Sequence, residues 1–444
     1  MVASSSLSAR LRSSVLVGMG KKKVEGDATQ DRGLGTFVGA LRRQLADKQR
    51  VVRAFDIGGS GVKTGLLGAS ALQDFLRFDG AVMSAAGDAA GADEELQWIE
   101  PQTLLGVAPG EDGFSSWLLE ALPRLRREVD DPHVCFGVSI GGDVEHATGM
   151  LRDWWPGGGH PRDFERPVLV AELMGLPPAR TFVLHDGEAH LLGCSRCAVP
   201  PPGLACLAIG SGIGLGITDA SGAVVDSSHP TGARSYCLSG IPLSGARYQG
   251  IWKQWLERPG GDNARVEEVK AMPFANMVNK PWRMPWVSLV LGRRGMEMAE
   301  AAFECPEPTA DNDEVRLPAV RAYGEQWLHF LHTQLVPQMC TGTRRHTIER
   351  LCFAGGVAER NWPALRETMV EANSDMLLPA SAVADDDASA AGSSKRGRPS
   401  QQKAKAPSAR PTVMPPAPVG SALIGSAIYA LAGVGGGAEG IWAR

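Results

Sequence analysis

One local pattern occurs twice in this chain: an apolar run, a glycine-rich turn and a second apolar run. The first copy is residues 51–68, VVRAFDIGGSGVKTGLLG, and the second is residues 204–217, LACLAIGSGIGLGI. Each copy predicts a β-hairpin, because apolar and β-branched runs favour strands and glycines favour the tight turn between them. Glycines at a hairpin tip leave backbone N–H groups bare, and such groups hold phosphate oxygens. Two such hairpins could grip a polyphosphate from opposite sides, although one alone is more often an ordinary turn.

Asp56 stands near the end of the first apolar run, just before the glycine-rich residues 58–61. A carboxylate beside bare N–H groups suits a phosphate that carries a magnesium ion. The stretch is not a P-loop, because the G-x-x-x-x-G-K-[ST] spacing is absent and no helix follows the turn.

Two more apolar runs end in residues that suit a site. Residues 133–139 predict a strand that runs into a Gly-Gly turn at residues 141–142, and residues 181–184 predict a strand that leads to Asp186. A helix is expected just beyond this acid, over residues 188–194. An acid between a strand end and a helix start is well placed for chemistry, but it could equally cap the helix.

Residues 350–354, RLCFA, predict a further strand, which is followed by Gly355 and Gly356 and then by a helix through residue 370. A glycine pair at this point leaves room for a flat ring, as the adenosine of a nucleotide requires. This segment is therefore a third candidate for contact with a nucleotide.

Composition limits the class of protein. The 444 residues suffice for two domains, and the formal net charge of −4 argues against a protein that coats nucleic acid. Eight cysteines show no disulfide framework, so we expect reduced thiols in a reducing compartment, cytoplasmic or organellar. The single C-x-x-C at residues 194–197 is interpreted as packing rather than as a zinc or redox site. No apolar run approaches the length of a membrane span.

Two segments differ in composition from the rest. Residues 1–49 are predicted to be an N-terminal tail or a transit-like segment, because the first 23 residues are basic, rich in serine and free of acids. Within it, residues 35–48 predict a short helix. Residues 380–418 are predicted to be a disordered insertion, because they cannot bury enough apolar surface to order themselves. Their KRGRP, residues 395–399, resembles an AT-hook core, but a basic linker is the commoner reading, so nucleic acid is not an expected partner.

Taken in order, the motifs resemble those of the ROK (repressor, open reading frame, kinase) family of sugar kinases, within the actin-like and hexokinase-like ATPase superfamily. The resemblance runs from residue 51 to residue 432 and rests on six segments: FDIGGSGVKTGLL (55–67), GVSIGGDV (137–144), FVLHDGEAHLLG (182–193), LAIGSGIGLGI (207–217), LCFAGGV (351–357) and SALIGSAIYALA (421–432). Any one match is weak, but the set in this order is specific.

The resemblance implies an α/β fold with two actin-like, ribonuclease H-like domains around a nucleotide cleft. The small domain would be residues 50–185, completed by a closing helix at residues 420–434, and the large domain would be residues 186–379. The implied activity is ATP-dependent, glucokinase-like transfer of phosphate to a hydroxyl of a small-molecule sugar, with Mg²⁺ as cofactor. Polyphosphate is an alternative donor, and a homodimer is compatible with the resemblance.

The resemblance also assigns roles to single residues. Asp186 would be the general base on the attacking hydroxyl, and Asp56 and Asp186 would hold the magnesium ion. The substrate would touch Gly141, His185 and Asp186. The nucleotide would be held by the two hairpins and the third glycine turn, through Asp56, Gly58, Gly59, Ser60, Lys63, Gly210, Ser211, Gly212, Gly214, Gly355 and Gly356.

The chain departs from the family's pattern on the sugar side. A Glu-x-Gly-His clamp and a cysteine-rich zinc loop usually follow the second hairpin, whereas residues 229–237 read HPTGARSYC and show neither. His185 also stands where the family has an asparagine. We therefore expect no structural zinc, and nucleotide binding is better supported than glucose binding. A nucleotide-binding sensor with weakened catalysis is the alternative function, while a repressor would need a helix-turn-helix, for which residues 1–49 are too short and irregular.

Overall fold

The computed structural model describes residues 26–58, 61–78, 102–105, 128–153, 167–210, 212–226, 243, 248, 253, 287–305, 313–331, 348–376, 412–413, 417 and 420–443. For residues 26–31, 102–105, 153, 288–289, 313, 369–376 and 412–413 the description covers the backbone alone. In the part of the chain so described, no helix combines the length and the apolar content that a bilayer crossing demands.

The first sheet has five strands in the order β3-β2-β1-β4-β8. Their bounds are Val51–Gly58 for β1, Gly61–Gly68 for β2, Gln102–Leu105 for β3, Val134–Ile140 for β4 and Thr181–His185 for β8. Strands β1, β4 and β8 are parallel, while β2 runs antiparallel to β1 and β3. The central strand β4 is buried along its whole length, which is typical of a strand covered on both faces.

The second sheet has four strands in the order β10-β9-β11-β12. Their bounds are Leu204–Ile209 for β9, Ile213–Ile217 for β10, Arg350–Ala354 for β11 and Thr412–Val413 for β12. It repeats the plan of the first sheet: a hairpin, β9–β10, beside parallel strands. Both predicted hairpins are therefore confirmed, and so is the predicted α/β class. A small third sheet contains β5 (Asp143–Glu145), β6 (Met150–Asp153) and β7 (Val168–Leu169).

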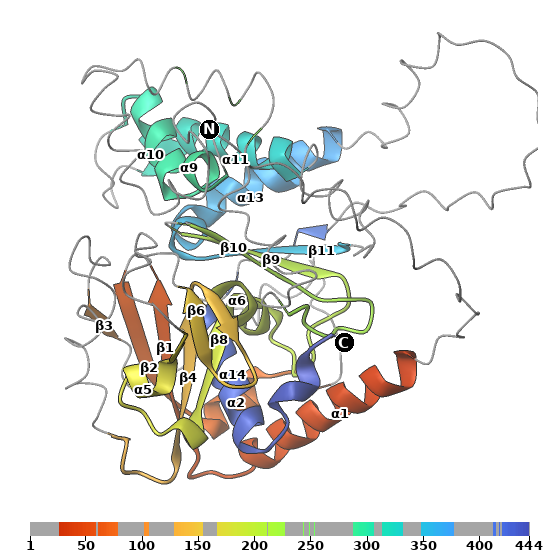
Figure 1. Ribbon diagram of the computed structural model, residues 1–444. Coiled ribbons are helices and arrows are strands. Elements are labelled where there is room, and N and C mark those ends of the chain that lie inside the picture. Colours follow the sequence, from red (N-terminus) through yellow and green to blue (C-terminus); the bar gives the residue numbers. More distant parts are fainter. Residues whose placement is uncertain are drawn as a thin grey trace, which may run out of the picture.

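Two helices, α6 (Asp186–Ser195) and α14 (Ser421–Val434), lie side by side between the two sheets (Figure 1). Helix α6 contacts β9 and β10, and α14 contacts β1 and β4. Glycines allow the two helices to touch backbone to backbone: a Cβ on Gly193 would lie 1.9 Å from the Ser421 carbonyl oxygen, and one on Gly425 would lie 1.8 Å from that of Ala189. The segment predicted to be a closing helix, residues 420–434, forms α14 and packs against the helix that Asp186 begins.

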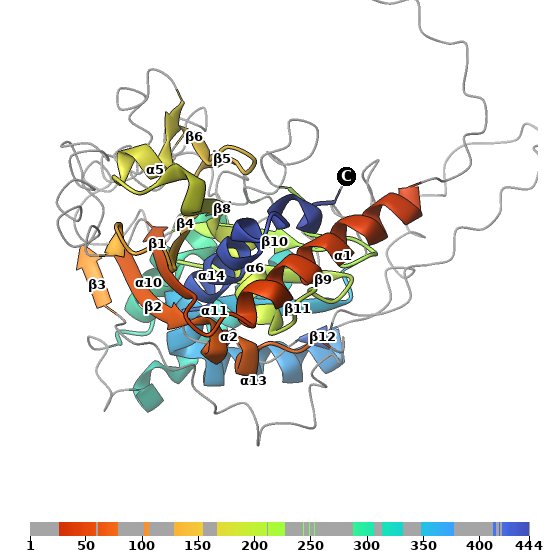
Figure 2. The same cartoon turned by 90° about the horizontal axis from the view of Figure 1, so that it is seen from below.

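Helix α1 (Gly26–Leu45) corrects the prediction that residues 1–49 are a tail. Its Phe37, Leu41 and Leu45 are buried against α14 and the short helix η11 (Ala438–Ile441), and Figure 2 shows α1 lying alongside α14. These three residues are the i, i+4, i+8 stripe of the short helix expected from the sequence. The helix is longer than expected, and it is part of the core. Residues 1–25 lie outside the described residues.

The other helices complete the two halves of the molecule. Helices α9 (Val287–Leu291), α10 (Arg293–Ala302), α11 (Asp313–Phe330) and α13 (Gly356–Met376) form a layer on one side of the second sheet (Figure 1). Their core contains the buried aromatic residues Tyr323, Trp327, Phe353 and Trp362. Beside the first and third sheets lie α2 (Ala69–Phe75), α5 (Val170–Leu173) and the 3-10 helix η3 (Pro178–Arg180). Strand β7 ends directly before α5 begins.

The predicted insertion, residues 380–418, is wrong at its C-terminal end. Strand β12 pairs in parallel with β11, and the backbone N–H of Ala417 donates to the carbonyl oxygen of Phe353. Ala417 is buried. The chain has therefore rejoined the second sheet before residue 418, because backbone pairing with a neighbouring strand needs no large apolar side chains. Residues 380–411 lie outside the described residues.

Candidate active site

The carboxyl ends of three parallel strands meet at one edge of the first sheet. In register, Ile57 of β1 lies beside Ile140 of β4, which lies beside His185 of β8. Gly58, Gly141 and Asp186 therefore follow one another along this edge, which is where ligands bind in sheets of this kind. The structure thus brings together the residues that the sequence predicted from three separate segments.

Asp56 and Lys63 are neighbours across the first hairpin. They are cross-strand partners in the β1–β2 register, and the Ser139 hydroxyl of β4 donates to Asp56 Oδ1 at 3.3 Å. A carboxylate and a hydroxyl at a strand end are oxygen ligands of the kind that Mg²⁺ prefers. The arrangement fits the predicted magnesium role of Asp56. Gly59 and Ser60, at the tip of this hairpin, lie outside the described residues.

The first turn of α6 shows which residue caps the helix. His185 is the N-cap: its Nδ1 accepts a hydrogen bond from Gly187 N at 3.2 Å, and Glu188 Oε2 accepts one from His185 N at 3.2 Å. Helix α6 begins at Asp186, two residues earlier than predicted. The interpretation of Asp186 as the cap is therefore wrong, since His185 and Glu188 together form the capping box.

Asp186 occupies the first position of α6, with a side chain that is 30% exposed. Its Oδ1 accepts from Gly187 N at 2.7 Å and lies 3.2 Å from His185 Nε2. A negative charge is stabilised at a helix N-terminus by the unpaired N–H groups there. Both ring nitrogens of His185 therefore face protein atoms, and its predicted contact with substrate stays a prediction.

The second hairpin lies directly on this turn of α6. A Cβ on Gly214 would stand 3.1 Å from Asp186 Oδ1, and one on Gly216 would stand 2.3 Å from the Gly187 carbonyl oxygen. The alternating glycines of β10 are what allow strand and helix to come this close. Gly214, predicted from the sequence to bind nucleotide, is thus beside the predicted general base.

The third glycine turn lies next to the second hairpin. Ala354, the last residue of β11, pairs with Ala208 of β9, so Gly210 and Gly355 follow neighbouring strand ends. Gly355 has φ of +86°, and a Cβ there would lie 2.6 Å from the Ile209 carbonyl oxygen. Only glycine suits both conditions. Helix α13 then begins at Gly356. In the neighbouring second hairpin, Gly210 N donates to Gly212 O at 2.9 Å. Ser211, between these two glycines, lies outside the described residues.

Glu359, in the first turn of α13, is a site residue that the sequence analysis missed. Burial raises the pKa of this carboxyl, the charges of His190 and Lys63 lower it, and the charge of Asp56 raises it. Asp56 and Lys63 of the first sheet are thus among the charged groups that shift the pKa of a carboxyl on α13. An acid shortly after a glycine turn is visible in the sequence and could have marked Glu359 as a candidate. The local pattern gave no reason to relate Glu359 to Asp56, which is distant in the sequence.

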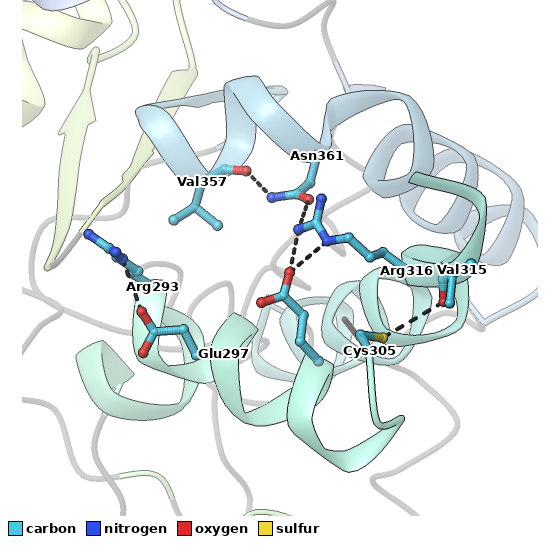
Figure 3. Close-up of polar contacts among 8 residues, drawn as sticks. Arg293, Glu297, Cys305, Val315, Arg316, Val357 and Asn361 are labelled. Carbon is cyan, nitrogen blue, oxygen red and sulfur yellow. Dashed lines mark hydrogen bonds and ion pairs between the residues drawn. The ribbon is translucent and has the colours of Figure 1, made fainter. Parts of the chain in front are cut away.

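A buried polar network holds the start of α13 in place (Figure 3). Arg316 of α11 is ion-paired with Glu300 of α10 and donates to Asn361 Oδ1 at 3.2 Å. Asn361 Nδ2 in turn donates to the Val357 carbonyl oxygen at 2.8 Å. Because charge-assisted bonds of this kind fix geometry, the network joins three helices around the third glycine turn.

Arg293 is a second residue that sequence reasoning missed. Its backbone N–H donates to the Gly210 carbonyl oxygen at 2.8 Å, which ties the start of α10 to the second hairpin. Its side chain is 60% exposed and pairs with Glu297 at 3.0 Å (Figure 3). The link between α10 and the glycine turn is therefore made by the backbone of Arg293.

Solved structures similar to this chain include sugar kinases. A ROK family glucokinase from Streptomyces griseus in complex with glucose and AMPPNP is 14% identical with a TM-score of 0.42, and the match covers 85% of this chain and 98% of that one. A ROK hexokinase from Thermus thermophilus is 17% identical with a TM-score of 0.37, covering 85% and 97%. An inorganic polyphosphate/ATP-glucomannokinase from Arthrobacter sp. strain KM is 14% identical with a TM-score of 0.40, covering 86% and 98%. No protein-family model and no curated protein sequence matches the chain.

Proposed function

We propose that this protein is an ATP-dependent phosphotransferase that acts on a hydroxyl group of a sugar, with Asp186 as the general base. The observation that carries the proposal is the position of Asp186: it directly follows strand β8 of the first sheet, begins the central helix α6 and lies against Gly214 of the second hairpin. A partly exposed carboxylate between two glycine hairpins can accept a proton while bare N–H groups hold phosphates nearby.

Each part of the site has a task in this reaction. Asp186 takes the proton of the attacking hydroxyl, and its place at the first position of α6 fixes the carboxylate beside the second hairpin. The glycine turns at Gly58 and Gly210 hold the phosphates, and Lys63 adds a positive charge beside them. Most of the rate of phosphoryl transfer comes from positioning and charge neutralisation, which such turns supply.

Asp56 is the residue proposed to hold magnesium, together with Asp186. Bound Mg²⁺ would neutralise charge on the transferred phosphoryl group. Gly355 and Gly356 would face the adenosine of ATP, and polyphosphate, which has no ring, is the alternative donor. Gly141, next to Asp186 along the sheet edge, is the proposed backbone contact of the sugar.

A nucleotide-binding sensor is the second candidate, and one contact favours it. His185 Nε2 lies 3.2 Å from Asp186 Oδ1. A base that is paired with a neighbouring imidazole is less available to take a proton from substrate. In a sensor the two hairpins would still hold nucleotide, but the proton would not be transferred.

The two functions are distinguished by turnover. ADP release would be measured by a coupled assay with ATP and Mg²⁺ across hexoses, amino sugars and polyols, and phosphate transfer from polyphosphate would be followed separately. Turnover on any of these acceptors supports the kinase and removes the sensor. Nucleotide binding without turnover supports the sensor, and the absence of binding to both ATP and polyphosphate contradicts both functions.

A further inference from the structure

A second group of ionisable side chains surrounds Glu188, which follows Asp186 by two residues in α6. None of its members is a predicted site residue. His146 Nε2 lies 3.1 Å from Glu188 Oε2 and 3.2 Å from Asp226 Oδ1. His146 is in the turn between β5 and β6, Glu188 is in the first turn of α6, and Asp226 follows β10. The three side chains therefore join three separate parts of the fold.

The imidazole of His146 is buried, yet neither of its nitrogens forms a hydrogen bond among the described residues. Its ring stacks on Trp442, with centroids 4.2 Å apart and planes 13° apart. Trp442 Nε1 and the Tyr429 hydroxyl, whose rings are also in contact, likewise have no hydrogen-bond partner in the described part of the chain. Buried polar atoms are nearly always satisfied, so this concentration of unsatisfied atoms indicates a missing partner.

The charges of the cluster point to a cation. Glu188 is fully buried and Asp226 is 26% exposed, so two carboxylates face one imidazole in a space largely closed to water. The three ligand atoms lie within 4.8 Å of one another, so two carboxylate oxygens and one imidazole nitrogen converge on the same small space. Nitrogen and oxygen donors gathered in this way are the ligands that a divalent cation takes in proteins.

The spacing of the three ligand atoms fits a metal ion better than a hydrogen-bonded triad. A single N–H at Nε2 cannot serve two carboxylate oxygens well, and here it is aligned with neither. Around an ion with metal–ligand distances of about 2.1 Å, neighbouring ligand atoms lie roughly 3.0–3.4 Å apart. The two separations from Nε2, 3.1 and 3.2 Å, agree with that geometry, and the two carboxylate oxygens lie within 4.8 Å of each other.

We propose that His146, Glu188 and Asp226 bind one divalent transition-metal ion, such as Zn²⁺ or Mn²⁺. The imidazole ligand favours these ions over Mg²⁺ and Ca²⁺, which prefer oxygen alone. The partial exposure of Asp226 gives the ion a route of entry, and the unsatisfied Tyr429 hydroxyl and Trp442 indole suit a water bound to it.

This site does not depend on the proposed kinase activity. It uses none of the residues assigned to nucleotide or substrate, and it is distinct from the cysteine-rich loop whose absence argued against structural zinc. Its effect on the fold is to tie the β5–β6 turn of the first half and the segment that follows β10 to the first turn of α6. Because Glu188 Oε2 also caps α6, a bound ion would hold in place the turn that presents Asp186.

The test uses the full-length protein, from which bound metal is removed with a chelator. The protein is then titrated with Co²⁺ at neutral pH, and visible absorption and elemental analysis measure the bound ion. One Co²⁺ per chain is expected. His146→Gln and Asp226→Asn should each weaken the affinity by about 100-fold or more, because each removes a direct ligand. Glu188→Gln is not the primary variant, since it also alters the helix cap. Circular dichroism establishes whether each variant is folded. If His146→Gln does not fold, Asp226→Asn provides the test, because Asp226 is partly exposed and its substitution disturbs the core less.

Two control variants locate the ion. His133→Gln removes an exposed histidine, and Cys352→Ser breaks the other group of close ligand atoms, formed with Cys194 and Cys206, whose thiols lie within 4.8 Å of one another. Both controls should keep the Co²⁺ stoichiometry and the parent affinity. The proposal is overturned if the stripped protein takes up no stoichiometric ion, if Asp226→Asn binds as tightly as the parent, or if binding is lost in Cys352→Ser instead.

Discussion

The first turn of α6 carries two carboxylates that are surrounded very differently. Asp186 is 30% exposed and lies against a glycine of the second hairpin, whereas Glu188 is fully buried and faces a buried histidine. Both acids sit where a helix N-terminus stabilises negative charge. Their difference is access: Asp186 is open to a bound molecule, while Glu188 contacts the backbone of His185 and the ring of His146. Under the proposed function, the exposed acid would serve catalysis and the buried acid would serve the fold.

The largest expected effect follows from removing the proton acceptor. Asp186→Asn keeps the size of the side chain and an oxygen that can accept from Gly187 N. Phosphoryl transfer should fall by ~10²–10⁴-fold, the usual worth of a general base. Nucleotide affinity should stay within a few-fold, because the glycine turns hold the phosphates, and the melting temperature should barely change. Steady-state kinetics, calorimetric titration with nucleotide and thermal unfolding measure the three quantities.

Near-parent turnover in Asp186→Asn would contradict the assignment of this residue as base. A large drop in melting temperature would mean instead that Asp186 and Glu188 share one structural role. In either case the contrast between the two acids would be lost.

The reverse pattern is expected for the buried acid. Glu188→Ala removes the carboxylate that caps α6 and faces His146, and it should lower the free energy of unfolding by about 3 kcal/mol, the typical cost of leaving a buried partner unpaired. Denaturant unfolding measures this loss. The matched control is Glu145→Ala, a surface acid paired with Arg152, which should change stability by about 0–1 kcal/mol. Equal losses for the two variants would show that burial of Glu188 contributes nothing.

Two glycines of β10 allow the same comparison on the strand that covers this turn. A Cβ at Gly214 would meet Asp186 Oδ1 at 3.1 Å, whereas one at Gly216 would meet the Gly187 backbone at 2.3 Å. Gly214→Ala should mainly displace the carboxylate and reduce turnover by roughly 10- to 100-fold. Gly216→Ala should force strand and helix apart and reduce stability by about 1–3 kcal/mol. Identical effects of the two variants on turnover and melting temperature would refute this division.

The sequence predicted the parts of the site that local pattern determines. The two hairpins, the strand ends and the glycine turn at Gly355 were found because strand propensity and turn chemistry act over a few residues. The contact between Gly214 and Asp186 could not be predicted in that way, since it depends on how α6 packs on β10. The same holds for Glu359, whose nearest charges in the first hairpin belong to a distant part of the chain.

Two other misses have the same physical origin. Helix α1 was assigned to a tail because the basic, serine-rich first 23 residues set the interpretation of residues 1–49. The apolar stripe predicted within residues 35–48 in fact packs against α14. The cluster of His146, Glu188 and Asp226 carries no sequence motif, because its ligands come from three segments that only the fold brings together. Even the cap of α6 was assigned to the wrong residue, since histidine is not among the usual capping residues.

The smallest effect is expected at that cap, and it tests what His185 does for the exposed acid. His185→Asn replaces the ring with a side chain whose oxygen can accept the same hydrogen bond from the first turn of α6, so the melting temperature should change little. It also removes the imidazole that lies 3.2 Å from Asp186 Oδ1. If His185 acts only through Asp186, kcat should change by a few-fold and the KM for the sugar should stay the same, because both ring nitrogens face protein atoms. A large rise in the KM for the sugar, with KM for ATP unchanged, would instead show that His185 touches the substrate directly. Asp186 would then not be the only residue of this turn that faces the bound sugar.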